Sequence, residues 1–254
     1  MYLEKFRLDG KTAVITGGSR GIGREIALAY AEAGANVMVA SRKLADLEKV
    51  TAEITDRGGT GRAVAAHTGK MDDLKNLIDE TIGAFGGIDI LVNNAAINPV
   101  FGPVEDMDEA LFDKMIDVNV KACLFLSKMA LPSMEGRGGG VIVNVSSVEG
   151  FSPSFGTGVY NITKAGVIML TKVLAGEWAS KKIRVNCIAP GLIKTHFSEF
   201  LWSNEQPREI FEQKCPMRRV GDPDEIAGLA LYLASPASSY TTGAVFVADG
   251  GLLI

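Results

Sequence analysis

Three side chains in the middle of the chain have the chemistry needed to move a proton. Tyr160 and Lys164 are four residues apart, and Ser147 lies thirteen residues before Tyr160 at the end of an apolar stretch. Residues at i and i+4 share one face of a helix, so a helical segment here places the ammonium beside the phenol. A free phenol ionises at about pH 10, and a nearby cation favours the phenolate. The spacing therefore predicts an acid–base pair, although Tyr and Lys also meet in this way on solvated helices.

A glycine-rich turn near the N-terminus predicts a second functional element. It runs from Thr16 to Gly23 with the sequence TGGSRGIG, directly after an apolar run. Such a turn lets the backbone approach a pyrophosphate, whose charge the N-terminus of the following helix stabilises. The spacing is not the G-x-G-x-x-G order of most Rossmann proteins, but the strand–turn–helix position indicates a dinucleotide site. The expected contacts are Gly17, Ser19, Arg20, Gly21, Ile22 and Gly23.

The end of the second expected strand indicates which dinucleotide is bound. In NAD-binding units an acidic residue there binds the ribose 2′-hydroxyl, whereas an arginine accommodates a 2′-phosphate. Here the strand ends with Ser41 and Arg42, no acid occurs before Asp46, and Arg20 is a second cation. We therefore expect NADP(H), with NAD(H) less favoured. The alternative is that Arg42 only begins a solvated helix.

The composition predicts one globular domain that acts on a small molecule. Of 254 residues, 47% are hydrophobic and 22% charged, which is enough for a large core. The net charge of −4 and the absence of a basic run argue against a nucleic-acid partner. Three unpaired cysteines and two histidines favour a reducing compartment and no metal site. No apolar run could span a membrane and no signal-peptide core begins the chain, so we expect a cytoplasmic protein without a membrane partner.

Strand-like and helix-like segments alternate along the chain. Strands are expected at 12–16, 36–41, 63–66, 88–92, 141–145, 184–188 and 244–247. Helices are expected at 21–33, 44–57, 72–85, 105–131, 159–179 and 223–234, and Pro132 should end the fourth of them. This alternation is typical of a parallel sheet covered by helices on both faces. The predicted fold is α/β, a doubly wound Rossmann sheet forming one domain over residues 1–254, with the irregular segment 191–220 as a candidate substrate lid.

These motifs occur in order with others, and together they resemble the short-chain dehydrogenase/reductase family over essentially the whole chain. The other motifs are Asn93-Asn94-Ala95-Ala96, Asn119 and Pro190-Gly191. The resemblance implies hydride transfer between a nicotinamide cofactor and a ketone, aldehyde or secondary alcohol. It implies that Ser147 binds the carbonyl oxygen and that Tyr160 exchanges a proton with it. Lys164 would lower the pKa of Tyr160 and hold the nicotinamide ribose, and Asn119 would hold a water of the proton relay.

The resemblance also implies further contacts with the cofactor. Asn93 and Ala95 would lie against the adenosine and stabilise the sheet, with a simple turn as the alternative. Pro190 and Gly191 would present Ile193 to the carboxamide and Thr195 to a phosphate. The family usually has an adenine-binding Asp where this chain has His67-Thr68-Gly69, so His67 or its backbone would take that contact. Successive strand residues point to opposite faces, so only one of Ser146 and Ser147 can face the site. The spacing to Tyr160 in the family favours Ser147, which leaves Ser146 as a structural neighbour.

Within the family, the chain most resembles the NADP-dependent carbonyl and retinal reductases. The likeness lies in His67-x-Gly69-Lys70, Asn94 to Pro99, Ser152-Pro153 and Ala189 to Thr195. An apolar substrate pocket is expected from aromatic and aliphatic residues, with core packing as their alternative role. These residues are Phe101, Phe151, Phe155, Phe197, Phe200, Leu201 and Trp202. The family also implies a homotetramer with paired helices around Asn119 and Tyr160.

Two other functions compete with this one. A reductase of 3-oxoacyl thioesters on an acyl carrier protein would share every catalytic residue and would need cations at the pocket mouth. The candidates are Lys128, Arg137, Lys172, Arg218 and Arg219. A non-catalytic NADP-binding regulator belongs to a different class. Intact Ser147, Tyr160 and Lys164 argue against it, because binding alone needs none of their proton chemistry.

Overall fold

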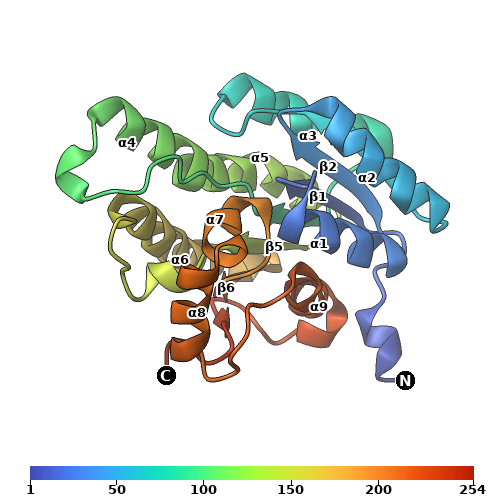
Figure 1. Cartoon of the computed structure of the whole chain (residues 1–254). Coiled ribbons are helices and arrows are strands. Elements are labelled where there is room, and N and C mark those ends of the chain that lie inside the picture. Colours follow the sequence, from blue (N-terminus) through green and yellow to red (C-terminus); the bar gives the residue numbers. More distant parts are fainter.

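A seven-stranded parallel sheet in the order β3-β2-β1-β4-β5-β6-β7 forms the centre of the computed structural model, which describes residues 1–254 (Figure 1). The strands are β1 (Thr12–Thr16), β2 (Asn36–Ser41), β3 (Thr60–Ala65), β4 (Ile90–Asn93), β5 (Gly140–Val145), β6 (Ile183–Pro190) and β7 (Val245–Ala248). Every residue of β1 and β4 is buried, as expected for strands covered on both faces. The predicted doubly wound fold is confirmed.

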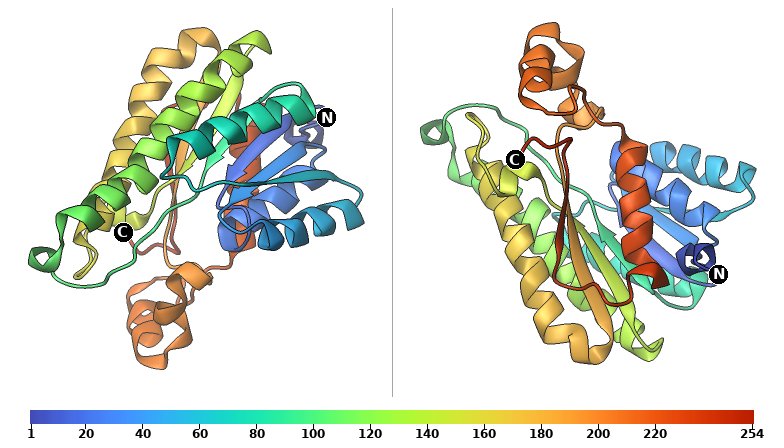
Figure 2. Two further views of the ribbon diagram at one scale, coloured as in Figure 1. Left: turned by 90° about the horizontal axis from the view of Figure 1, so that it is seen from above. Right: turned by 90° about the horizontal axis from the view of Figure 1, so that it is seen from below.

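Helices cover both faces of the sheet (Figure 2). They are α1 (Gly21–Glu32), α2 (Leu44–Asp56), α3 (Met71–Phe85), α4 (Glu109–Ile116), α5 (Ala122–Gly136), α6 (Gly158–Trp178), α7 (Glu199–Ser203), α8 (Glu205–Lys214) and α9 (Pro223–Ala234). The helices α1, α2 and α9 share one apolar core with the sheet, and α3, α5 and α6 share the other. No helix is long and apolar enough to cross a lipid bilayer.

The strand order reverses between β1 and β4, and this reversal positions the site. The chain leaves β1 toward β2 on one side, whereas β4 and β5 extend the sheet on the other. Ligands of such sheets bind in the crevice at the carboxyl ends of the strands at this reversal. The glycine turn follows β1, Ser147 follows β5, and Pro190 ends β6. Segments far apart in the sequence are therefore brought to one edge of the sheet.

The helix expected at 105–131 is divided in the structure. A short 3-10 turn covers Val104–Asp106, α4 follows, and a π-helical turn at Asp117–Lys121 joins α4 to α5. Asp108 begins α4 because its side chain accepts a hydrogen bond from the N–H of Leu111 at 2.7 Å. The prediction that Pro132 ends the helix is wrong, since α5 continues to Gly136. Ala130 and Met134 are fully buried on either side of Pro132, and this packing offsets the hydrogen bond that proline removes.

The segment proposed as a lid has helical structure and stands out from the body of the molecule in both views of Figure 2. It contains α7 and α8, which are orange in the figures. Its base is held by hydrogen bonds from Lys194 N–H to Gly221 O at 2.9 Å and from Gly221 N–H to Leu192 O at 3.1 Å. The two ends of the segment therefore lie together, as a hinged flap requires.

Candidate active site

The two adjacent serines after β5 have different surroundings. The Ser146 hydroxyl donates to the backbone oxygen of Lys164 at 2.7 Å, so it ties the strand end to α6. Ser147 is in extended backbone at the start of a 3-10 turn, and its Oγ accepts a hydrogen bond from the N–H of Glu149 at 3.2 Å. That contact uses a lone pair and leaves the hydroxyl proton free to be donated. The structure thus gives Ser146 the structural role expected for it and presents Ser147 to the crevice.

Tyr160 and Lys164 lie on one face of α6, as their spacing predicts. The Lys164 Nζ is 5.5 Å from the centroid of the Tyr160 ring. The same Nζ donates to the backbone oxygen of Val145 at 2.9 Å, and the lysine side chain is buried. The ammonium is therefore fixed between the end of β5 and the phenol. The predicted acid–base pair is present in the folded chain.

The pKa values of this pair differ from the sequence-based expectation. Burial raises the pKa of Tyr160 above its ordinary value, and the Glu149 carboxylate raises it further, while a hydrogen bond with Ser147 opposes the rise. Burial lowers the pKa of Lys164 itself to about 8. The resemblance implied that Lys164 lowers the pKa of Tyr160, whereas in the protein chain alone this pKa is raised, and activation by Lys164 stays a prediction.

Asn119 occupies the π-helical turn between α4 and α5. Its Nδ2 donates to the Ile97 oxygen at 2.9 Å, and its Oδ1 accepts from the Ile97 N–H at 2.8 Å. Nδ2 also donates to Thr163 Oγ1 at 3.1 Å, next to Lys164 on α6. A single buried asparagine thus joins the loop after β4 to the helix that carries Tyr160. The sequence predicted an ordinary helix here, whereas π turns often occur at functional sites.

The glycine turn is packed too closely to accept side chains. Gly17 has φ +68°, and a Cβ there would lie 2.7 Å from Nδ2 of Asn94. A Cβ on Gly23 would lie 2.4 Å from the Gly17 oxygen. Asn94 holds the turn by donating to the Thr16 oxygen at 2.9 Å. Its role was not among the predicted contacts, although its place beside Asn93 and Ala95 was a signal.

The surroundings of the turn fit an anionic dinucleotide. No side chain caps the N-terminus of α1, and no acidic residue lies in its first turn. The backbone N–H groups there are thus left for an anion, which is how such turns bind phosphates. Arg20 precedes Gly21 and Ile22 at this end of α1, and Gly21 has φ +56°. The predicted residues of the turn are brought together at one end of the crevice.

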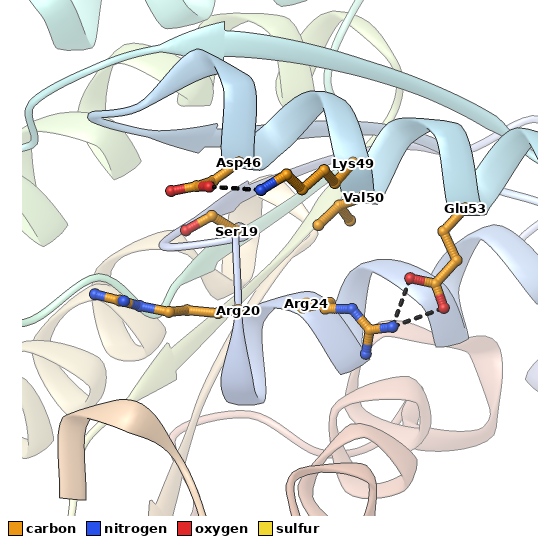
Figure 3. Close-up of a pocket in the computed structure, with 7 residues that line it drawn as sticks. All are labelled: Ser19, Arg20, Arg24, Asp46, Lys49, Val50 and Glu53. Atoms are coloured by element: carbon orange, nitrogen blue, oxygen red, sulfur yellow. Dashed lines mark hydrogen bonds and ion pairs between the residues drawn. The ribbon is translucent and has the colours of Figure 1, made fainter. Parts of the chain in front are cut away.

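A pocket lies between this turn and α2 (Figure 3). Its lining residues are Ser19, Arg20, Arg24, Asp46, Lys49, Val50 and Glu53. Arg24 is paired with Glu53 at 2.7 Å and Lys49 with Asp46 at 3.3 Å, whereas Arg20 points away from both pairs. Ser41 ends β2, and Arg42 follows it exposed to solvent. Arg20 and Arg42 form no ion pair, so their charges are available to a ligand.

Three residues predicted from the family have mainly local partners. Asn93 Nδ2 donates to Asn144 Oδ1 at 2.8 Å, so its buried side chain joins β4 to β5 instead of facing a cofactor. The Ala95 N–H donates to Thr16 Oγ1 at 3.1 Å, which fastens the loop after β4 to the glycine turn. The Nδ1 of His67 accepts from the N–H of Gly69 at 3.0 Å. The Asn93 contact agrees with the predicted sheet-stabilising role, and the predicted contact of Asn93 with the adenosine stays a prediction.

The segment after β6 links the two ends of the crevice. Pro190 ends the strand and the Gly191 N–H donates to the Ala248 oxygen at 3.0 Å, while Ile193 is buried. The position of a Cβ on Gly21 lies 3.0 Å from Cγ2 of Thr195, so Thr195 stands over the glycine turn. Two residues further, the ring of Phe197 lies 5.8 Å from that of Tyr160, centroid to centroid. One short turn of the lid therefore reaches both the predicted cofactor site and the phenol.

The apolar residues assigned to a substrate pocket are not part of the core. Phe101, Phe155 and Phe200 are 66%, 80% and 74% exposed. Phe151, Phe197 and Leu201 are also exposed, and Trp202 is held to the lid by donating to the Thr195 oxygen at 2.8 Å. Core packing was the alternative role for these side chains, and the structure contradicts it. These side chains are therefore exposed to solvent, and their assignment to a substrate pocket stays a prediction.

The cations considered for an acyl carrier protein do not gather at one place. Arg137 pairs with Asp89 at 2.9 Å, just before β4 and thus at the opposite edge of the sheet from Ser147. Arg219 pairs with Glu225 at 2.6 Å, and Arg218 donates to backbone oxygens of α8. Lys128 lies over the ring of Phe125 on α5, and Lys172 lies on the exposed side of α6. No group of three or more His, Cys, Asp or Glu side chains is arranged to hold a metal.

The fold and the site define a class of protein: an oxidoreductase that places a nicotinamide dinucleotide at the strand-order reversal beside a Ser-Tyr-Lys group. The family model described as enoyl-(acyl carrier protein) reductase matches residues 17–253. Dehydrogenase/reductase SDR family member 4 of Oryctolagus cuniculus is 43% identical over 244 residues, which cover 96% of this chain and 94% of the relative. The chain belongs to the short-chain dehydrogenase/reductase family.

Two solved structures show the same fold. One, described as an NAD(P)-dependent gluconate 5-dehydrogenase from Beutenbergia cavernae, has bound NADP. It is 35% identical with a TM-score of 0.93, and the match covers 98% of this chain and 99% of that one. The other is a 7α-hydroxysteroid dehydrogenase complexed with NADH and 7-oxo glycochenodeoxycholic acid. It is 36% identical with a TM-score of 0.94, and the match covers 98% of this chain and 96% of that one.

Proposed function

We propose that the chain is an NADP(H)-dependent carbonyl reductase or secondary-alcohol dehydrogenase for apolar substrates. The observation that carries this proposal is the meeting of Ser147, Tyr160 and Lys164 at the strand ends beside a glycine turn flanked by unpaired Arg20 and Arg42. Each part alone could be structural. Their convergence on one crevice supports a carbonyl–alcohol reaction, because a binding protein needs no proton donor there.

The residues have distinct tasks in this proposal. The bound dinucleotide supplies or accepts the hydride. As negative charge grows on the substrate oxygen, Ser147 and Tyr160 donate hydrogen bonds to it and so stabilise the transition state more than the ground state. Tyr160 then gives its proton to complete the alcohol, or takes one in the reverse direction. Lys164 holds positive charge beneath the phenol and is the candidate ligand of the nicotinamide ribose.

The charged residues at the predicted 2′-phosphate site support a preference for NADP(H). A 2′-phosphate requires cations, and Arg20 and Arg42 are free of carboxylate partners at the place where it would lie. The solved relatives contain NADP in one case and NADH in the other, so family membership alone gives no preference. The absence of an acid between Ser41 and Asp46 supports NADP(H).

Exposed aromatic residues on the lid and in the segment between Ser147 and Tyr160 support an apolar substrate. Phe197 contacts the phenol from the lid, and Phe151 and Phe155 follow Ser147 in the chain. The solved relative with a 7-oxo steroid at its site supports an apolar ketone as the ligand class. A 3-oxoacyl thioester on an acyl carrier protein is less favoured, because the candidate cations are dispersed.

We further propose a homotetramer. The outer face of α6 carries the exposed residues Ile162, Met169 and Val173, and α5 adds Leu124. An apolar stripe of this kind on two neighbouring helices is suited to pairing with a second copy. Light scattering should give four times the mass of the 27.0 kDa chain, and a monomer mass would contradict the proposal. The cytoplasmic location expected from the sequence stays a prediction.

A turnover screen tests the function. The purified protein is offered aliphatic and aromatic ketones, aldehydes and secondary alcohols with NADPH/NADP⁺ and with NADH/NAD⁺, together with an acetoacetyl thioester. We expect the highest kcat/KM with an apolar ketone or alcohol and with the phosphorylated cofactor. Preference for the thioester would favour the acyl carrier protein alternative. Tight NADPH binding without any turnover would favour the non-catalytic regulator.

A further inference from the structure

The carboxylate of Glu149 collects hydrogen bonds from the segment that joins Ser147 to Tyr160. Its Oε1 accepts from the Ser154 hydroxyl at 2.6 Å. Its Oε2 accepts from the Ser154 N–H at 3.0 Å and from the Thr157 hydroxyl at 3.1 Å. Thr157 is the residue directly before α6. A charged acceptor makes stronger hydrogen bonds than a neutral one, so these contacts fasten the loop to the start of the helix.

A fourth donor comes from the residue next to Tyr160. With its amide nitrogen turned toward the loop, Asn161 donates to Glu149 Oε2 at 2.9 Å and to the Thr157 oxygen at 2.9 Å. Asn161 is 8% exposed, so its amide needs protein partners. The contact ties Glu149 to the first turn of the helix on which Tyr160 stands.

Glu149 also acts on Ser147 through the backbone. Its N–H donates to the Ser147 Oγ at 3.2 Å. The hydroxyl oxygen is thus held by one donor, and its own proton is directed elsewhere. Movement of Glu149 would therefore move the hydroxyl of Ser147 as well as the start of α6.

The Glu149 carboxylate has no cationic partner of its own. It forms no ion pair with Lys or Arg, and the donors around it are neutral hydroxyl, amide and backbone groups. The charged groups that face the phenol are Glu149 from this turn and Lys164 from α6, while the lid contributes the uncharged Phe197. The negative charge of Glu149 raises the pKa of Tyr160. It therefore favours the protonated phenol, which is the form that donates a proton.

We propose that Glu149 is a positioning residue that clasps the Ser147 turn to the first turn of the Tyr160 helix and places a negative charge near the two hydroxyl donors. This inference rests on the proposed oxidoreductase function. It assigns Glu149 a task beyond the Ser-Tyr-Lys group, because one side chain sets the geometry of both hydroxyl donors.

Three variants separate geometry from charge. Glu149→Gln keeps the size and much of the hydrogen bonding but removes the charge, and Glu149→Ala removes both. Glu177→Gln is the matched control, because Glu177 is exposed near the other end of α6. Alcohol oxidation needs the phenolate, so its rate rises with pH through the apparent pKa of Tyr160. For Glu149→Gln we expect the pH at which kcat for alcohol oxidation rises to be lower than in the wild type. The pH profile of Glu177→Gln should match that of the wild type.

The alanine variant tests the clasp. We expect kcat to fall about 10-fold or more, because small displacements of reacting groups are costly, while the Kd for NADPH changes little. Chymotrypsin should also cleave the loop faster at the exposed Phe151 and Phe155. A merely structural role would lower thermal stability without moving the pH profile of Glu149→Gln.

The outcomes are distinct. A Glu149→Ala variant with the kcat and the proteolysis rate of the wild type would overturn the clasp. Equal pH profiles of kcat for Glu149→Gln and Glu177→Gln would overturn the charge effect.

A second measurement tests Glu149 without catalysis. If the wild type itself shows no turnover, the proposed function fails, and this measurement still decides the role of Glu149. Ultraviolet titration of Tyr160, with Tyr160→Phe as the blank, should give ionisation at lower pH in Glu149→Gln than in the wild type. An unchanged titration would refute the inference.

Discussion

Asn119 donates from Nδ2 to the hydroxyl of Thr163 at 3.1 Å and so connects the π-helical turn to the helix that carries Tyr160 and Lys164. Both residues are buried, and the same Asn119 amide is bonded twice to the backbone of Ile97. The loop after β4, the π turn and α6 thereby form one hydrogen-bonded unit around the crevice.

Replacing Asn119 should damage stability and activity together. Asn119→Ala leaves the Ile97 N–H and oxygen and the Thr163 hydroxyl without this partner, at about 1–3 kcal/mol for each group that stays unsatisfied. Thr163→Val keeps the two bonds of Asn119 to Ile97 and removes the Asn119–Thr163 contact together with the bond from the Thr163 hydroxyl to the Tyr160 oxygen, so it should cost about 1–2 kcal/mol. Denaturant unfolding and kcat measure both effects. Equal free energies of unfolding for Asn119→Ala and Thr163→Val would contradict the stabilising effect of the two bonds between Asn119 and Ile97.

Removing the phenol hydroxyl should abolish most of the turnover. Tyr160→Phe keeps the ring beside Phe197 and Lys164 but removes the proton donor. We expect kcat to fall by about 10²- to 10⁴-fold, which is the usual contribution of general acid catalysis. Tyr160 is also a predicted cofactor contact, but NADPH binding, measured by fluorescence, should remain because most predicted contacts lie in the glycine turn and after β6. Tyr240→Phe is the control, since Tyr240 is fully exposed. Full activity in Tyr160→Phe would exclude its proposed role.

Cofactor preference should depend on two arginines. Arg42→Ala and Arg20→Ala each remove a cation without an ion-pair partner from the predicted 2′-phosphate site. Loss of a charged hydrogen bond costs about 1.5–3 kcal/mol, so the KM for NADPH should rise about 10- to 100-fold while that for NADH changes little. Arg62→Ala, an exposed position on β3, is the control. Equal effects on both cofactors would assign the arginines to another contact.

Lys164 should make stability depend on pH in the alkaline range. Burial lowers its pKa to about 8 in the fold from the ordinary lysine value of 10.5. Between these two values the unfolded chain binds more protons than the folded one, so stability rises with pH. Below about 8 both states are protonated, and the fold bears the cost of a buried ammonium. From pH 7 to pH 10 the wild type should gain about 2 kcal/mol relative to Lys164→Met. Parallel unfolding curves across this range would show that the lysine is not buried as described.

Much of the fold could be predicted because it depends on local sequence patterns. Apolar runs alternating with amphipathic segments specify parallel strands and covering helices, and most of the expected bounds agree with the structure within a few residues. The glycine turn was recognised because only residues without a Cβ fit there, as the contacts of Gly17 and Gly23 show. The two-residue period of strands showed that only one of Ser146 and Ser147 can face the site, and the family's spacing to Tyr160 favoured Ser147.

Other features depend on residues that are distant in the sequence. The helix at 105–131 was predicted as continuous, but Asn119 bonds to Ile97 across the crevice in a π turn. Pro132 was expected to stop a helix, but buried neighbours keep it in α5. The aromatic residues of the substrate site could equally have been core residues, because sequence does not report exposure. Glu149 had no motif to mark it, although its partners Ser154, Thr157 and Asn161 all lie within twelve residues of it, because only the folded loop turns their donors toward its carboxylate.

The sequence by itself determined which residue types could do chemistry, their periodicity and the alternation of strands and helices along the chain, because these follow from spacing along one chain. Only the tertiary structure decided how Tyr160 and Lys164 are charged. Burial raises the pKa of the phenol and lowers that of the ammonium, while Glu149 and the Val145 oxygen set what each group faces. Desolvation and electrostatic fields depend on every neighbour in space, and spacing along the chain carries no record of them.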